Sequence, residues 1–181
     1  QATVTVTDLS PPVISLIGAS SITLNVGDVF SDPGSIVSDN VSTGLVTTVT
    51  GTVSTAAVGN YSLKYNASDG AGNAAVEVTR TVNVVDNVAP DVTPPSSITV
   101  AATDASGTVS SDIGITAFLN AATANDAVDG SRPVSNNAPL TFPLGATVVT
   151  FTATDLSGNS GQAQATVTVT DLSPPVISLI G

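Results

Sequence analysis

The sequence predicts an all-β fold built of two tandem immunoglobulin-like β-sandwich domains in an extended arrangement. In residues 61–67 and again in residues 163–170, apolar and polar side chains alternate strictly, which is typical of strands with one buried face. Val and Thr dominate such runs, whereas Gly, Pro, Asn and Asp cluster between them, as strand and turn preferences require. No stretch shows a sustained helical period.

In the first domain, the alternation predicts strands over residues 13–18, 21–27, 45–53 and 60–68, with a loop over 28–44 and a hairpin turn over 69–73. The first strand is expected to leave the end where the chain enters the domain, and the second to return to it. The loop and the turn then share that end of the sandwich. Arg80 has the parity of the neighbouring Val residues, so we expect it at a strand end with a carboxylate partner or at a bulge.

Repeats define the organisation of the chain. Residues 1–18 recur unchanged as residues 164–181, so the chain is a window on a tandem array. Within one period, "DLSPP" from residue 8 returns as "DVTPP" from residue 91, and "ASDGAGN" from residue 67 returns as "ATDLSGN" from residue 153. Each repeat is therefore a pair of related domains, and its paired prolines predict short, stiff linkers. We assign residues 1–8 to the last strand and linker of a preceding repeat, 9–86 and 87–170 to the two domains, and 171–181 to the linker and first strand of the next repeat.

The composition excludes several classes of function. The chain has no Cys, His, Met or Trp, which rules out disulfides, zinc sites of the usual kind and a Ser-His-Asp triad. Its net charge is -11 with only three basic residues, so nucleic acid is not an expected partner. No apolar run approaches the roughly 18 residues of a membrane helix, and we expect no direct membrane insertion. Without a partner nucleophile or base for the acidic residues, the chain is not expected to be an enzyme.

The acidic residues point to calcium. Thirteen of the fourteen are Asp and only Glu77 is Glu; Asp tolerates turns and reaches a cation from a loop. On the predicted path, carboxylates converge where the chain enters each domain and repel one another unless a cation separates them. The first group is Asp8, Asp39 and Asp69, with Asp32 nearby; the second is Asp91, Asp126, Asp129 and Asp155, with Asp86 within reach. We expect one Ca²⁺ at each domain junction, joining a linker Asp to two loops of the following domain.

Two features qualify this expectation. Where the second domain has Asp129, the first has Ser42 or Thr43, so the first site is expected to be weaker. Asn73 and Asn159 are expected to shape their turns or to offer a carbonyl. The alternative stays open that Asp-x-x-Gly-Asn is a hairpin turn without metal and that an Asp before Pro-Pro caps a turn.

Two family resemblances follow from longer motifs. Residues 91–170, with "ATDASG", "DAVDG", "FPLGATVVTFTATDLSGN" and "VTVTD", resemble a hyalin repeat (HYR) domain. Residues 9–86, with "PPVISLIG", "VGDVFSDPG" and "GNYSLKYNASDGAGNAA", resemble the immunoglobulin-like domain of bacterial surface proteins and adhesins. Animal HYR domains carry two cysteines, and this chain has Asn136 and Phe151 at the matching positions. The resemblance implies an extracellular stalk or adhesin. The calcium expected from the Asp groups would lock the angle between neighbouring domains, by analogy with cadherin-type arrays.

The expected function is that of a stalk repeat in a large extracellular bacterial adhesin or filament. Its partners would be neighbouring repeats of the same polypeptide, with a surface ligand bound elsewhere in the full protein. One alternative is a module that binds glycan or protein, and another is a filament subunit that donates residues 1–7 or 176–181 as strands. Most of the six aromatic residues have the parity of core positions, which disfavours a sugar-stacking platform; these are Tyr61, Tyr65, Phe118, Phe142 and Phe151.

Overall fold

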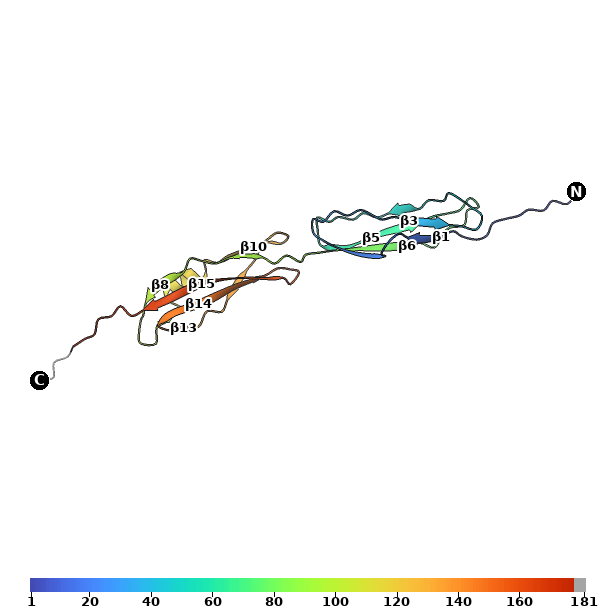
Figure 1. Cartoon of the computed structure of the whole chain (residues 1–181). Coiled ribbons are helices and arrows are strands. Elements are labelled where there is room, and N and C mark those ends of the chain that lie inside the picture. Colours follow the sequence, from blue (N-terminus) through green and yellow to red (C-terminus); the bar gives the residue numbers. More distant parts are fainter. Residues whose placement is uncertain (178–181) are drawn as a thin grey trace. The chain divides into compact units, whose positions relative to one another are not determined.

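The regular structure of the chain is almost entirely β. The computed structural model describes residues 1–177, and the chain divides into two units, Gln1–Asp86 and Asn87–Gly181. Each unit is built of strands, and the described part contains one short helix (Figure 1). The predicted all-β class is confirmed.

The first unit consists of two facing sheets. Strand β1 (Val13–Leu16) pairs antiparallel with β3 (Ser35–Ser38) in one of them. The other has the order β2-β6-β5-β4, with β2 at Ser21–Asn25, β6 at Val78–Val85, β5 at Gly59–Asn66 and β4 at Thr48–Thr50. The apolar side chains of the alternating run 61–67 face the core, as predicted: Leu63 and Tyr65 of β5 are buried and Tyr61 is half-buried.

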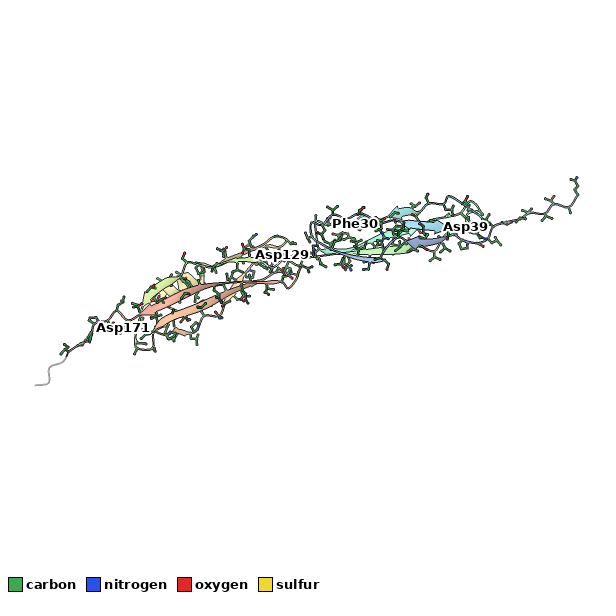
Figure 2. The ribbon with its side chains drawn as sticks, viewed as in Figure 1. Phe30, Asp39, Asp129 and Asp171 are labelled. Carbon is green, nitrogen blue, oxygen red and sulfur yellow. The ribbon has the colours of Figure 1, made fainter. Side chains whose placement is uncertain are left out.

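The path between β1 and β3 differs from the prediction. Strand β2 runs parallel to β6, so it leads away from the end where the chain enters, and β3 brings the chain back. Residues 28–34 therefore lie at the opposite end of this unit from Asp39, as the positions of Phe30 and Asp39 show (Figure 2). The alternation pattern did not predict β3, because the strand has only four residues. Its two apolar residues are adjacent, and one of them, Ile36, is 62% exposed.

Arg80, on β6, is fully buried and ties the two sheets together. Its guanidinium group forms an ion pair with Asp32. It also donates hydrogen bonds to three backbone carbonyls, those of Ile17 (2.6 Å), Ala19 (3.1 Å) and Gly34 (3.2 Å). The expected carboxylate partner of Arg80 is thus confirmed, although Arg80 lies inside β6 and not at a strand end. Asp32, placed by the prediction near the calcium ligands, instead serves this buried network, because it belongs to the segment that β2 carries to the other end.

Tyr65 completes the network. Its hydroxyl donates to Asp32 Oδ1 at 2.6 Å, and the Arg80 guanidinium lies 5.6 Å from the centre of its ring, within range of a cation–π interaction. Burial opposes ionisation of Asp32, but hydrogen bonds from Tyr65 and Gly34 and the charge of Arg80 outweigh it and hold its pKa below the usual value. Burial and the bond to Asp32 raise the pKa of Tyr65 to about 12. Asp32 is therefore charged at neutral pH and faces the guanidinium group of Arg80 as an ion pair.

The second unit repeats this topology. A three-stranded sheet has the order β11-β10-β7, with β11 at Gly130–Ser131, β10 at Thr123–Asp126 and β7 at Asp91–Thr93. A four-stranded sheet has the order β12-β14-β15-β8, with β12 at Val134–Asn136, β14 at Gly145–Thr154, β15 at Ser160–Thr170 and β8 at Ile98–Ala101. A small ribbon joins β9 (Thr108–Val109) to β13 (Thr141–Phe142). Strand β8 is parallel to β15 as β2 is to β6.

A helix that the sequence did not predict lies between β9 and β10. Helix α1 (Ile113–Leu119) begins after Asp112, whose side chain accepts hydrogen bonds from the backbone N–H groups of Gly114 and Ile115, as an N-cap residue does. Ile115 and Phe118 are its buried residues, and seven residues are too few for a helical period to stand out. No helix in the described part of the chain is long and apolar enough to cross a membrane.

Phe118 of α1 packs edge-on against Phe151 of β14, with ring centres 5.7 Å apart. Both belong to the core of the second unit together with Phe142, so the predicted core role of the three Phe residues is confirmed. Asn136 lies directly opposite Phe151 in the β12–β14 register. At the position where the resemblance places a cysteine, Phe151 thus fills the core with an aromatic ring.

The Arg80 network predicts a specific loss of stability. Asp32→Asn removes the counter-charge of a fully buried guanidinium, and breaking such a pair from one side costs about 3 kcal/mol. We expect the unfolding free energy of the first domain to fall by that amount in urea titrations. The matched control is Asp28→Asn, at an exposed Asp that accepts only a local bond from the Asn25 backbone N–H. Equal effects of the two substitutions would contradict the assignment.

Candidate metal centres

Two groups of carboxylates converge in the structure. Site A consists of Asp8, Asp39 and Asp69, and site B of Asp86, Asp126, Asp129 and Asp155; in each group, one oxygen per residue lies within 4.8 Å of all the others. Asp39 and Asp129 mark the two sites in Figure 2, each at one end of its own unit. Of the residues predicted for the two sites, the structure brings these seven together and leaves Asp32 and Asp91 outside.

The loop Asp of each site is held by its own backbone. Asp39 Oδ1 accepts hydrogen bonds from the N–H groups of Val41 (3.0 Å) and Ser42 (2.7 Å). Asp126 Oδ1 accepts the same pair of bonds from Val128 (2.8 Å) and Asp129 (2.9 Å). Such turns are local and favour Asp at their first position. The loop carboxylates therefore have one oxygen fixed by the turn and the other, Oδ2, left for the site.

The turn Asp of each site pairs with the Asn four residues later. Asp69 accepts the Asn73 backbone N–H (2.7 Å) and side-chain amide (2.6 Å), and Asp155 accepts both from Asn159 at 2.7 Å. Burial opposes their ionisation, but these hydrogen bonds outweigh it and lower the pKa of both carboxyls. The turns thus favour charged carboxylates. Asn73 also donates to the Asp8 carbonyl at 3.2 Å, so it ties residue 8 to the turn without metal.

The linker Asp of site B is Asp86, and Asp91 does not take that place. Asp91 is an exposed residue of β7, opposite Asn125 of β10. Asp86 directly follows β6, which ends at Val85. In the same way Asp171 directly follows β15. The position directly after a strand is therefore the feature of the sequence that indicates Asp86. The match between "DLSPP" and "DVTPP" indicates Asp91 instead, because it aligns Asp91 with Asp8.

A single position distinguishes the two sites. In site B, Asp129 Oδ2 accepts the backbone N–H of Leu156 at 2.6 Å. In site A, the equivalent N–H, that of Gly70, points to Ser42 Oγ at 3.4 Å. Gly70 and Leu156 each follow the turn Asp. Ser42 therefore occupies the place of Asp129, and site A has one carboxylate fewer.

The carboxylates of both sites carry oxygens that nothing in the described chain satisfies. Asp8 Oδ2, Asp39 Oδ2 and Asp126 Oδ2 are buried without a hydrogen-bond partner. Of the basic side chains, Lys64 pairs with Glu77 and Arg80 with Asp32. The third, Arg132, donates through Nε to the Thr154 carbonyl at 3.2 Å. A buried acceptor without a donor is costly, and several in one place are a favourable setting for a cation.

The chemistry of this donor set suits Ca²⁺. All side-chain ligands available are oxygens, and calcium takes six to eight of them from carboxylates, carbonyls and water with tolerant geometry. Nitrogen and sulfur ligands, which zinc prefers, are absent from the sequence as a whole, since it has no His and no Cys.

The fold and the two acidic sites define a protein of tandem immunoglobulin-like β-sandwich modules. Residues 14–84 match the family model described as a bacterial surface protein Ig-like domain, and residues 85–169 match that of the HYR domain. The chain therefore consists of a bacterial surface protein Ig-like domain followed by a HYR domain, and both predicted resemblances are confirmed. These are non-catalytic families of surface proteins, which confirms that the chain is not an enzyme and indicates an extracellular location.

Two curated relatives are hyalins of sea urchins. The chain is 34% identical over 191 residues to hyalin of Lytechinus variegatus, covering 95% of this chain and 34% of that protein. It is 33% identical over 192 residues to hyalin of Strongylocentrotus purpuratus, covering 98% and 15%. The chain thus spans about a third of the length of one of these relatives and less of the other.

Solved structures resemble the chain more distantly. A lipoprotein of Bacteroides thetaiotaomicron matches 80% of this chain and 61% of its own, at 19% identity and a TM-score of 0.36. The fibronectin(III)-like modules of Clostridium thermocellum CbhA match 92% and 100%, at 16% identity and a TM-score of 0.34. Scores this low carry no argument about function.

The tie between Asn73 and residue 8 can be tested without metal. Asn73→Ala removes the amide that bridges Asp69 and the Asp8 carbonyl, and a hydrogen bond to a charged group contributes about 2 kcal/mol. We expect the first domain to lose about that much unfolding free energy in chelator. The control is Asn60→Ala, at an exposed position of β5. A loss no larger than the control's would show that the bridge contributes nothing.

Proposed function

We propose that this chain is a structural stalk repeat of a large extracellular bacterial adhesin or filament, stiffened by Ca²⁺ bound at sites A and B. Its function is mechanical: it extends the protein away from the cell surface. Its partners are neighbouring repeats of the same polypeptide, and adhesion to a surface ligand is left to another part of the full protein.

The observation that carries the calcium proposal is Asp126. The residue is 2% exposed, and its Oδ2 has no hydrogen-bond partner. One oxygen of its carboxyl group lies within 4.8 Å of an oxygen of each other carboxylate of site B. A buried, unpaired carboxylate oxygen is one of the most costly groups a protein can hold. A divalent cation among these oxygens would convert their repulsion into attraction.

Stiffening would follow from the origin of the ligands. In site A, Asp8 comes from the linker, Asp39 from the loop after β3 and Asp69 from the turn after β5. A cation shared by all three would fix the linker to two loops of the domain it enters. The Asn73 bridge to the Asp8 carbonyl would hold the linker close enough for the ion to complete the attachment.

The tandem array is supported by a seven-residue sequence that occurs twice in the chain, once exposed and once within a sheet. Residues 1–7 are identical to residues 164–170, the C-terminal part of β15, where Val167 and Val169 are at most 2% exposed. In residues 1–7 the equivalent Val4 and Val6 are 86% and 93% exposed. A strand with this pattern needs a sheet over its apolar face. We propose that residues 1–7 complete the HYR sheet of a preceding repeat; donation to a second chain is the alternative.

The aromatic residues favour a structural role over glycan binding. Four of the six are buried in the domain cores, namely Tyr65, Phe118, Phe142 and Phe151. Phe30 and Tyr61 are half-buried, and the Tyr61 hydroxyl donates to the Ala57 carbonyl. None of them is offered as an exposed face on which a sugar could stack.

Calcium is predicted to stabilise the chain against heat. A ligand present at a hundred times its dissociation constant adds about 2.7 kcal/mol, which for a domain of this size raises Tm by about 11 to 22 °C. We expect calorimetry to show such a rise between chelator and saturating calcium. Asp126→Asn should remove most of the rise in the second domain, whereas Asp104→Asn, at an exposed turn Asp outside both sites, should retain it. A Tm that does not respond to calcium would refute the metal sites.

The tandem array is predicted to be stiff and extended only when calcium is bound. In small-angle scattering of a chain with three 163-residue periods, we expect a rod in saturating calcium and a smaller radius of gyration in chelator. The double variant Asp39→Asn, Asp126→Asn should resemble the chelated form in both buffers. Equal flexibility with and without calcium would reject stiffening even where calcium binds.

A further inference from the structure

We infer that the two sites respond to calcium in sequence, site B at low and site A at higher concentration, and that the pair Asp129 and Ser42 sets the difference. This inference rests on the proposed calcium function and adds how that function is regulated. It assigns an affinity-determining role to two side chains that occupy equivalent places in the two domains.

The loop and turn carboxylates of the two sites are held by matching hydrogen bonds. Asp39 and Asp126 accept the same pair of backbone bonds. Asp69 and Asp155 accept the same pair of bonds from Asn73 and Asn159. The sites therefore share this framework and differ in the carboxylate at the position of Asp129 and in burial.

Charge and burial act in the same direction. Site B has four carboxylates, of which Asp86, Asp126 and Asp155 are at most 6% exposed. Site A has three, and of these only Asp69 is buried, at 8% exposure. Each added carboxylate strengthens the attraction for a divalent ion, and burial lowers the dielectric that would screen it. In calcium-binding proteins the number of charged ligands tunes the affinity over several orders of magnitude.

Positioning adds to the difference. Asp129 is held in place by a 2.6 Å bond from the Leu156 backbone to its Oδ2, which leaves its charge fixed beside the other carboxylates. Ser42 is neutral, and the bond that it accepts from Gly70 is long at 3.4 Å. A ligand group that is already in place loses less conformational entropy on binding the ion. Both the charge and the order of the fourth position therefore favour site B.

A repeat with unequal sites would stiffen in two steps. The joint before each HYR domain would close at the lower calcium concentration, while the joint before each Ig-like domain would stay a hinge until the concentration rises. Because the two kinds of domain alternate along the array, half of the joints would stiffen at low calcium concentrations and the other half only at higher ones.

The test is isothermal titration of calcium into the full chain after chelator treatment and desalting. We expect two binding events whose dissociation constants differ at least about ten-fold. Asp126→Asn should remove the tighter event and Asp39→Asn the weaker one. Ser42→Asp should tighten the weaker event toward the other and leave the tighter one unchanged. Asp129→Ser should weaken the tighter event, with its fold checked by circular dichroism in chelator.

The outcomes separate the inference from the function on which it rests. Two events that merge in Ser42→Asp support the inference, and this variant adds a ligand, so its reading does not depend on how well Asp129→Ser folds. Two equal sites in the unchanged chain, or a Ser42→Asp variant with the original weak event, would overturn the inference while calcium binding stands. An unchanged chain that binds no calcium would overturn the proposed function itself.

Discussion

Both sites depend on one arrangement of hydrogen bonds, in which the backbone of a turn holds Oδ1 of an Asp and thereby directs its Oδ2 toward other carboxylates. Asp39 and Asp126 are held in this way by the two N–H groups that follow them. Carboxylates placed this close repel one another strongly in a partly buried site. The turns are local and form with the strands, so they keep together groups that electrostatics alone would separate. The repulsion stored in the folded domain is the source of the affinity that we propose for a cation.

The two domains share a topology and close their sandwiches by different means. Where the Ig-like domain returns from β2 to β3 through the segment that contains Asp32, the HYR domain has helix α1. In the first case a buried ion pair of Asp32 and Arg80 joins the sheets; in the second, Phe118 packs on Phe151. Neither domain has a disulfide, since the chain has no Cys. The common frame keeps the acidic end of each domain the same while the remainder of the core differs.

Much of this architecture could be read from the sequence, because period-2 alternation and repeated turns are local signals. The matching turns predict Asp69 and Asp155, and the loops expected at the same end of each domain predict Asp39 and Asp126. Asp32 was misplaced because its position depends on β3, a strand whose four residues alternate too weakly to be seen. The proline spacing predicts Asp91 as the linker ligand, with Asp86 within reach, whereas the structure places Asp86 in site B and Asp91 outside it. For Asp32 the missing information was the long-range pairing of strands, which no short motif contains. For Asp86 a local signal was present, because the residue directly follows the end of β6.

The scarcity of basic residues explains why the sites would take a metal and not a salt bridge. Lys64 and Arg80 are already paired with Glu77 and Asp32, which leaves Arg132 as the third base of the chain. Protonation offers little relief either, since the amides of Asn73 and Asn159 donate to the turn carboxylates and so favour their charged form. Charge balance at sites A and B must then come from solution. Calcium would meet that need with oxygen ligands alone. Because each site gathers Asp residues from separate segments, an ion that neutralised them would also join those segments.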